Sequence, residues 1–368
     1  MQNLMHTATD EIRHVVMQAL GRLAASGKLP AEPLPPFGVE VPSDRAHGDF
    51  SANVAMVSAR ALKMPPRRIA EAILEELSLT GTYFTHAEVA GPGFLNFFLA
   101  PAWYTAILNA VQAEGEGYTR TALGGGKKIM VEYVSANPTG PMHMGNARGG
   151  ALGDCLASVL EHAGYDVTRE FYVNDAGNQI AKFAKSLEVR YFQIFKGEDA
   201  VPFPEDGYHG DDIRERAKEF AAQYGENYLN APEDERRKAL ASFGIERNVK
   251  KLHDDLLKYR IEYDVWFRES VLHEDGELAD AIALLKERGA AYEKDGALWY
   301  AATRFGAEKD EVLVRANGIP TYFAADIAYH RNKFEKRGFA KVVDVWGADP
   351  HGHVARRNGA RDAIGVGG

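Results

Sequence analysis

The sequence predicts an α/β domain with a parallel β-sheet, preceded by a smaller α+β domain. The α/β assignment depends on residues 127–173. There the apolar strand KKIMVEYV is followed by a loop rich in Gly and Pro, a helix ALGDCLASVLEHAG and a second strand DVTREFYV. A continuous apolar strand is typical of a sheet buried on both faces, and the order strand, helix, strand is that of a right-handed βαβ unit.

The first hundred residues show a mixed order of elements. They predict, in chain order, a helix at about 10–25, a Pro-rich connection, a short strand near Val39, helices within 51–64 and 67–77, and alternating strands within 83–99. Such a mixture is typical of an α+β domain. We therefore expect an N-terminal domain at residues 1–105 and a second domain at 120–368, joined by a helix at about 102–115 and the flexible string RTALGGGKK.

The second domain is expected to continue with helices and then hairpins. Residues from about 178 to 258 are helical and rich in charge, and a mainly helical insertion is expected at about 195–300. Hairpin-like strings follow (DGALWYAATRFG and EVLVRANG), then a helix beginning near Tyr322 and a last strand, KVVDVWGAD. Because ligands of open α/β sheets bind at the carboxyl ends of the strands, the loop at 135–149 is the expected binding edge.

Composition restricts the class of protein. The chain has 368 residues, of which 45% are hydrophobic and 26% charged, with a formal net charge of -9. These values predict a globular protein with two or three separately cored domains. No apolar run reaches the roughly 18 residues of a membrane span, so a cytosolic protein without membrane attachment is expected. The single cysteine, Cys155, excludes a disulfide framework and is predicted to be a small core residue.

The tetrad HMGN, residues 143–146, is the first candidate for chemistry. It lies just ahead of the predicted helix, whose free N–H groups and dipole attract phosphate. Gly145 would let a nucleotide approach the backbone, while His143 and Asn146 would donate hydrogen bonds to phosphate oxygens during displacement at phosphorus. A histidine at a helix start is also commonly a cap or a packed ring, so the tetrad alone leaves both interpretations open.

The longer string VEYVSANPTGPMHMGNARGGALGD, residues 131–154, resembles the signature of arginyl-tRNA synthetases, in which HMGN stands for the first class I signature. The strings HGDFSANVAM and EVAGPGFLNFFL resemble the N-terminal domain of that family, and FYVNDAGNQI, GIPTYFAADIAYH and VWGAD follow in the family's order. The resemblance implies a Rossmann-like class I synthetase catalytic domain with a helical insertion. It also implies an N-terminal domain that contacts the tRNA elbow.

The resemblance further implies the residues of two small-molecule sites. His143 and Asn146 would be catalytic, stabilising the triphosphate while the arginine carboxylate attacks the α-phosphorus and pyrophosphate leaves with magnesium. The implied ATP-binding residues are Pro138, Thr139, Gly140, His143, Gly145, Asn146, Gly347, Asp349 and His353. The implied arginine-binding residues are Glu132, Ser135, Asn137, Tyr322 and Asp326. A guanidinium needs carboxylates, which indicates Glu132 and Asp326, although either one alone would be interpreted as a solvated carboxylate or a helix-dipole partner.

The string GADPHGH, residues 347–353, matches a pattern that borders the adenosine in class I enzymes. Gly347 would admit the nucleotide, and Asp349 would accept from a ribose hydroxyl. Pro350 departs from the family, which usually has a second histidine there, and it has no N–H to donate. His351 and His353 could instead suggest a metal site, but no third ligand at a useful spacing accompanies them in the sequence, and no protein-bound metal is expected.

The resemblance thus implies an arginine–tRNA ligase, expected to be a monomer, that activates L-arginine with ATP and magnesium and transfers it to tRNA(Arg). The class I MSK loop and the anticodon-binding domain are not found in the sequence. The chain therefore resembles the first two thirds of the enzyme, and we expect it to be inactive or nearly so. Two alternatives stay open: an inactive tRNA-binding fragment, and a small-molecule nucleotidylyltransferase that would need no guanidinium pocket.

Overall fold

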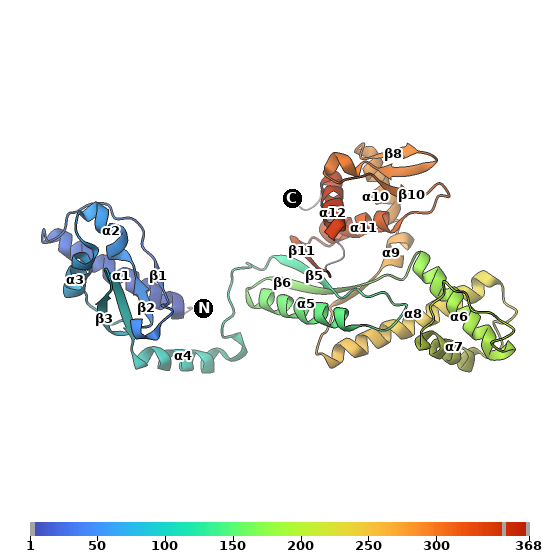
Figure 1. Ribbon diagram of the computed structural model, residues 1–368, viewed down its shortest axis with the longest axis horizontal. Coiled ribbons are helices and arrows are strands. Elements are labelled where there is room, and N and C mark those ends of the chain that lie inside the picture. Colours follow the sequence, from blue (N-terminus) through green and yellow to red (C-terminus); the bar gives the residue numbers. More distant parts are fainter. Residues whose placement is uncertain (1–3, 348–350, 366–368) are drawn as a thin grey trace. The chain divides into compact units, whose positions relative to one another are not determined.

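The computed structural model describes residues 4–347 and 351–365, with the backbone alone for residues 351–357. The chain divides into two compact units, residues 1–120 and residues 121–368, which Figure 1 colours along the sequence. Each unit contains buried apolar clusters of its own. Each is therefore a folding unit with its own core.

The N-terminal unit is an antiparallel sheet packed against helices, with strand order β1-β2-β4-β3. Its elements are α1 (Leu4–Ala25), β1 (Val39–Glu40), η1 (Arg45–His47), β2 (Phe50–Ala52), α2 (Val54–Leu62), α3 (Pro66–Glu76), β3 (Phe84–Ala90), β4 (Phe94–Leu99), α4 (Pro101–Glu114) and η2 (Gly115–Gly117). Ile12 of α1, Ile69 of α3 and Phe97 of β4 share one core. The predicted α+β order is confirmed.

The second unit is built on a four-stranded parallel sheet of order β11-β5-β6-β7. Its strands are β5 (Lys128–Tyr133), β6 (Asp166–Val173), β7 (Val265–Arg268) and β11 (Lys341–Val345). Helix α5 (Met144–His162) connects β5 to β6, so the predicted βαβ unit is confirmed. The helical layer consists of α6 (Asn178–Lys196), α7 (Asp211–Tyr224) and α8 (Glu233–Lys258). Strand β7 follows that layer and lies within the segment expected to be an insertion, yet it belongs to the parallel sheet.

Helices cover both faces of this sheet. Side chains alternate between the faces along a strand. Tyr133 of β5 points to the face covered by α5, where its ring lies directly against Gly153. The neighbouring Glu132 points to the opposite face, which is covered by α11 (Tyr322–Arg331) and the π-helical turn η4 (Asn332–Lys336). Burial on both faces explains the continuous apolar strands of the sequence.

A smaller antiparallel sheet, of order β10-β9-β8, packs with helices beside the parallel sheet (Figure 1). The remaining elements are α9 (Glu269–Glu274), α10 (Glu277–Glu287), β8 (Ala291–Lys294), β9 (Ala297–Tyr300), η3 (Ala302–Phe305), β10 (Glu311–Val314) and α12 (His351–Ile364). Leu285 of α10, Tyr300 of β9 and Phe323 of α11 lie in one core. This core fixes the start of α11, and with it Tyr322.

Two sequence predictions about α5 were wrong. The helix begins at Met144 rather than near residue 151, so the HMGN tetrad is the first turn of the helix and its cap. Cys155 is exposed, not a core residue. The helix turns Gly150, Gly153 and Ala157 toward the sheet, and a period of 3.6 residues places Cys155 on the opposite side with the exposed Leu152 and Val159.

Within the described ranges, every helix is too short or too polar to cross a bilayer.

Candidate active site

A cavity of about 1020 Å³ lies at the carboxyl edge of the parallel sheet. Strands β5 and β11 are neighbours there although they are far apart in the sequence, so the strand order reverses between them. Ligands of open α/β sheets bind at such a point. Every strand of the sheet leads into the cavity wall, which includes Val134 and Asn137 after β5, Asn174 after β6, Glu269 after β7, and Val345, Trp346 and Gly347 at the end of β11.

The chain leaves β5 through a strained turn. Val134 has φ 68° and Ser135 has φ 40°, in the left-handed region that a β-branched residue rarely adopts. Ser135 N donates to Tyr133 O at 2.9 Å, which closes a three-residue turn around Val134. Conformations of this kind cost on the order of 1–3 kcal/mol each and persist where the surroundings hold them. Here the Ser135 hydroxyl donates to Glu132 Oε1 at 3.0 Å and accepts from Tyr172 N at 3.1 Å.

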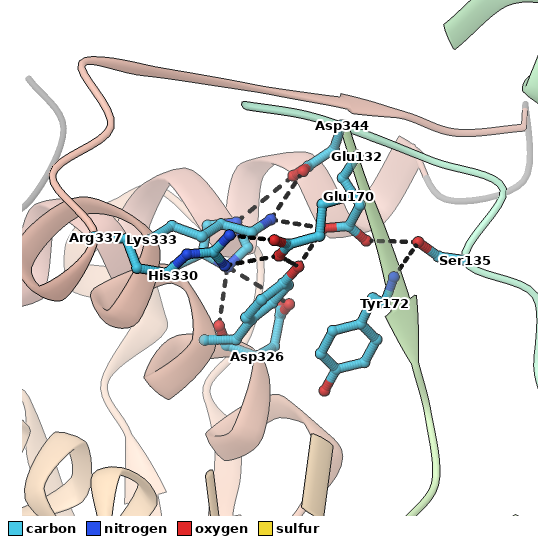
Figure 2. Close-up of polar contacts among 10 residues, drawn as sticks. Glu132, Ser135, Glu170, Tyr172, Asp326, His330, Lys333, Arg337 and Asp344 are labelled. Atoms are coloured by element: carbon cyan, nitrogen blue, oxygen red, sulfur yellow. Dashed lines mark hydrogen bonds and ion pairs between the residues drawn. The ribbon is translucent and has the colours of Figure 1, made fainter. Parts of the chain in front are cut away.

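Glu132 lies behind the cavity wall, inside a buried polar network (Figure 2). Its Oε2 accepts from Lys333 Nζ at 2.6 Å and from the Tyr329 hydroxyl at 3.1 Å, while its Oε1 accepts from Ser135. Both oxygens of the carboxylate are therefore engaged within the protein. The contact of Glu132 with the cavity is indirect, through Ser135 and the turn.

The other predicted arginine-binding residues divide between the wall and the network. Asn137 and Tyr322 line the cavity, and both are exposed. Asp326 is one helical turn after Tyr322, and His330 Nδ1 lies 2.9 Å from its carbonyl oxygen and 3.6 Å from its carboxylate. The fold thus brings residues from β5 and α11 to one edge of the sheet, as the proposed pocket requires. Their contact with arginine stays a prediction.

The tetrad at the start of α5 forms a capping box. His143 Nδ1 accepts from Gly145 N at 3.1 Å, and Asn146 Oδ1 accepts from His143 N at 3.0 Å. Because Nδ1 is an acceptor, the proton of a neutral His143 ring is on Nε2. The ring can therefore cap the helix and still donate from Nε2, and Asn146 can still donate from its amide nitrogen. The cap and the phosphate-binding interpretations of this histidine are compatible.

The remaining predicted ATP-binding residues divide between the helical layer and the cavity wall. Pro138 O accepts from Asn248 Nδ2 of α8 at 2.8 Å, and Thr139 beside it is buried, so this part of the loop is packed on the helical layer. Gly347 lines the cavity, and a Cβ added there would meet no described atom within 4 Å. Asp349 and Pro350 lie outside the described residues, as does the side chain of His353.

Comparisons with known proteins agree with this architecture. The family model described as "Arginyl tRNA synthetase N terminal domain" matches residues 10–99. The family model described as "tRNA synthetases class I (R), catalytic domain" matches residues 107–358. The chain belongs to the class I arginyl-tRNA synthetase family. Its Rossmann-like fold class, predicted from the sequence, is thereby confirmed.

Individual members of the arginyl-tRNA synthetase family align along the whole chain. The arginine–tRNA ligases of Caldanaerobacter subterraneus and Ruminiclostridium cellulolyticum are 55% and 53% identical to it over 366 residues, covering 100% of this chain and 65% of each relative. The arginyl-tRNA synthetase of Thermus thermophilus shares the fold, with a TM-score of 0.54 at 23% identity, over 96% of this chain and 63% of that one. This chain thus spans 65% of the length of each of these two relatives. The nucleotidylyltransferase alternative is not favoured.

The cavity of this synthetase domain also contains a carboxylate that the sequence analysis did not single out. Glu269 is buried at the cavity wall, and the Tyr172 hydroxyl donates to its Oε2 at 2.7 Å. His273 Nε2 lies 3.8 Å from its Oε1. Burial raises the pKa of Glu269 above its usual range, because the carboxylate has lost water without gaining a close cation. Its sequence signal was its position directly after the short strand VWFR. That strand was missed because it lay within the expected helical insertion.

The string YVNDAGNQI positions this carboxylate. Asp175, in the loop after β6, accepts from Ser270 N through Oδ1 and from the Ser270 hydroxyl through Oδ2, both at 2.9 Å. The two bonds fix the first turn of α9, the helix that begins with Glu269. The loop after β6 therefore holds the end of β7 in place. Within the string YVNDAGNQI, Asp175 therefore has a structural role, because it holds the helix that begins with Glu269.

Close packing against the His143 ring is a second reason for glycine at position 145, besides the close approach of a nucleotide. A Cβ at this position would lie 2.9 Å from His143 Cε1 and 3.0 Å from His143 Nδ1, which is closer than side chains pack. We expect Gly145→Ala to displace the His143 ring and to weaken ATP binding by about tenfold, while stability changes by less than about 1 kcal/mol because helix propensity offsets the lost cap. Isothermal titration with ATP and chemical denaturation measure the two effects.

The matched control is Gly149→Ala on the same helix, where an added Cβ would meet no described atom within 4 Å. It adds the same methyl group without touching His143, so ATP affinity should stay within about twofold of the parent. Equal ATP affinity for both variants would show that the His143 ring takes no part in binding phosphate.

Proposed function

We propose that this chain carries the arginine and ATP sites of an arginine–tRNA ligase. In the proposed reaction the carboxylate of L-arginine attacks the α-phosphorus of ATP, the bond to the leaving pyrophosphate breaks, and arginyl-adenylate forms. The arginyl group is then transferred to tRNA(Arg). Magnesium would enter with the ATP phosphates, as the family implies. Translation takes place in the cytoplasm, and this is the compartment that we propose.

The observation that carries the proposal is the buried carboxylate at the cavity wall. A guanidinium is charged at any working pH and is best bound by a desolvated carboxylate that accepts from its planar donors. Glu269 is such a group: it is buried, lines the cavity, and has the neutral Tyr172 hydroxyl as its nearest partner. We propose that it binds the guanidinium together with Asp326.

The remaining predicted residues have supporting roles in this proposal. Asn137 and Ser135 lie at the end of β5 and would bind the polar groups of the amino acid, with Tyr322 as a wall. Glu132 would act through Ser135, because its own carboxylate is already bonded by Lys333 and Tyr329. In this proposal, some residues contact arginine at the cavity wall, and Glu132 holds Ser135 in place from behind that wall.

The ATP half of the proposal is supported by the start of α5. Nε2 of His143 and the amide nitrogen of Asn146 can donate hydrogen bonds at a helix N-terminus, where the dipole favours anions. They would stabilise charge that grows on the phosphate oxygens during displacement. Gly347, at the end of β11, would leave room for the adenosine side of the nucleotide.

Calorimetric titration of the 368-residue chain with arginine, lysine and citrulline tests the proposal. Citrulline has nearly the shape of arginine without its charge, and lysine has the charge without the planar donors. We expect arginine to bind at least about tenfold more tightly than either, because a desolvated charge pair is worth more than a neutral hydrogen bond. Equal or tighter binding of lysine would contradict the proposed pocket.

A further inference from the structure

Three acidic side chains form a row across the parallel sheet, one on each of three neighbouring strands. Asp344 of β11 is in register with Glu132 of β5, and Glu132 is in register with Glu170 of β6. All three point to the face covered by α11 and η4, as Figure 2 shows. Glu170 is fully buried, Glu132 is nearly so, and Asp344 is partly buried. Like charges side by side in a buried sheet repel, so the row depends on cations.

Lys333 supplies the central cation of this row. Its side chain has no exposure to solvent, and its Nζ lies 2.6 Å from Glu132 Oε2 and 3.1 Å from Asp344 Oδ1. The nearby carboxylates raise the pKa of Lys333 even though burial by itself lowers it. The third carboxylate of the row, that of Glu170, accepts from Arg337 Nη1 at 2.9 Å. The Tyr329 hydroxyl lies between Glu132 and Glu170. The ammonium therefore joins strands β5 and β11 to one helix.

That helix also carries part of the proposed arginine pocket. Lys333 lies in the π-helical turn that continues α11, whose first turns carry Tyr322 and Asp326. A π turn inside a helix is uncommon and is frequent near functional sites. Through its two carboxylate contacts, Lys333 holds α11 against the two strands whose ends form the cavity wall. The strand ends and the helix are thereby kept in one arrangement.

The same ammonium also controls the strained turn after β5. With Lys333 bonded to Oε2, Glu132 keeps Oε1 for the Ser135 hydroxyl, which in turn accepts from Tyr172 N. The Tyr172 hydroxyl at the other end of that residue donates to Glu269. Without the ammonium, Glu132 would be a buried carboxylate lacking a cation, and it would take up a proton or turn toward water. Either change alters its bond to Ser135.

We infer that Lys333 is a positioning residue for the arginine pocket, acting through Glu132 and Asp344 without touching the ligand. This inference rests on the proposed function, because it assigns Lys333 to the arginine site and not to the ATP site. The start of α5 does not share these contacts: His143 and Asn146 are held by their own capping box. Loss of the Lys333 ammonium should therefore lower the affinity for arginine much more than the affinity for ATP.

The test is titration of Lys333→Met with arginine and, separately, with ATP. Methionine has a similar length and no charge. We expect arginine affinity to fall by about tenfold or more while ATP affinity stays within about threefold, because the lost ammonium holds Glu132 and Asp344 behind the arginine side of the cavity. The control is Lys336→Met, which removes an exposed lysine from the same π-helical turn and should leave both affinities within about twofold.

A second variant keeps the test decisive if the single change unfolds the protein. Lys333→Met with Asp344→Asn removes one positive and one negative charge, so the net charge of the network is unchanged, yet Glu132 still lacks its ammonium. We expect it to fold and to show the same selective loss of arginine. Parent-like arginine binding by either variant, or an equal loss of both ligands, would overturn the inference. Absence of selective arginine binding by the parent chain would instead overturn the proposed function.

Discussion

Gly153→Ala is expected to destabilise the second unit strongly. Gly153 packs on the aromatic ring of Tyr133, and a Cβ built there would lie 2.5 Å from Tyr133 Cβ and 2.7 Å from its Cδ2. The ring cannot retreat, because it is buried and packs against Tyr263 with ring centroids 4.6 Å apart. Overpacking in a rigid core costs about 1–3 kcal/mol, and at this separation we expect at least the upper value.

Helix propensity acts in the opposite direction, since alanine is favoured over glycine by about 1 kcal/mol inside a helix. The net loss in the free energy of unfolding should therefore be about 2 kcal/mol or more. Denaturant unfolding measures it through the fluorescence of Trp266, which stacks on Phe171 in the same core, with ring centroids 4.3 Å apart. Gly149→Ala is the control: with open space around its Cβ, it should keep or raise stability by up to about 1 kcal/mol. Similar unfolding midpoints for both variants would contradict the packing of α5 on β5.

Glu269→Gln is expected to remove most of the arginine affinity. Glutamine has nearly the same shape and can still accept from Tyr172, so the pocket should keep its form while losing its buried charge. Removing one partner of a desolvated charge pair costs about 2–5 kcal/mol, which corresponds to a loss of about thirtyfold or more in affinity. ATP affinity should stay within about threefold, and titration with each ligand measures the split.

The control for this change is Glu274→Gln, an exposed carboxylate on the same helix α9. It should leave arginine affinity within about twofold, because exposed charges contribute little. If Glu274→Gln and Glu269→Gln behave alike, Glu269 is not a guanidinium partner.

The raised pKa of Glu269 gives the same prediction a pH dependence. A carboxyl group with a raised pKa takes up its proton at a higher pH than ordinary carboxylates do, and arginine favours its ionised form. Arginine affinity of the parent should therefore fall as the pH is lowered toward the range in which carboxylates titrate, while the guanidinium itself stays charged. Glu269→Gln should lack this component, so the two profiles should converge at low pH.

Much of the fold followed from local patterns. The largely apolar runs that became β5 and β6 were recognisable because a strand covered on both faces buries most of its side chains, with Glu132 and Glu170 as buried polar exceptions. Strand β7 was missed because it is only four residues long and follows a long helical layer, and its identity as a strand depends on pairing with β6. Cys155 was misplaced because an apolar string around a residue does not say which side of a helix faces the sheet.

The candidate site divides in the same way. The family and the signature blocks could be recognised from the sequence, because the HMGN tetrad and the string after β5 are contiguous in the chain. The carboxylate that faces the cavity and the one that is neutralised inside the protein could be told apart only in the folded chain. Glu132 is bound by Lys333, 201 positions away, whereas Glu269 reaches the cavity wall with a tyrosine as its partner. Burial and charge pairing depend on which distant segments pack together, and no local pattern of residues records that.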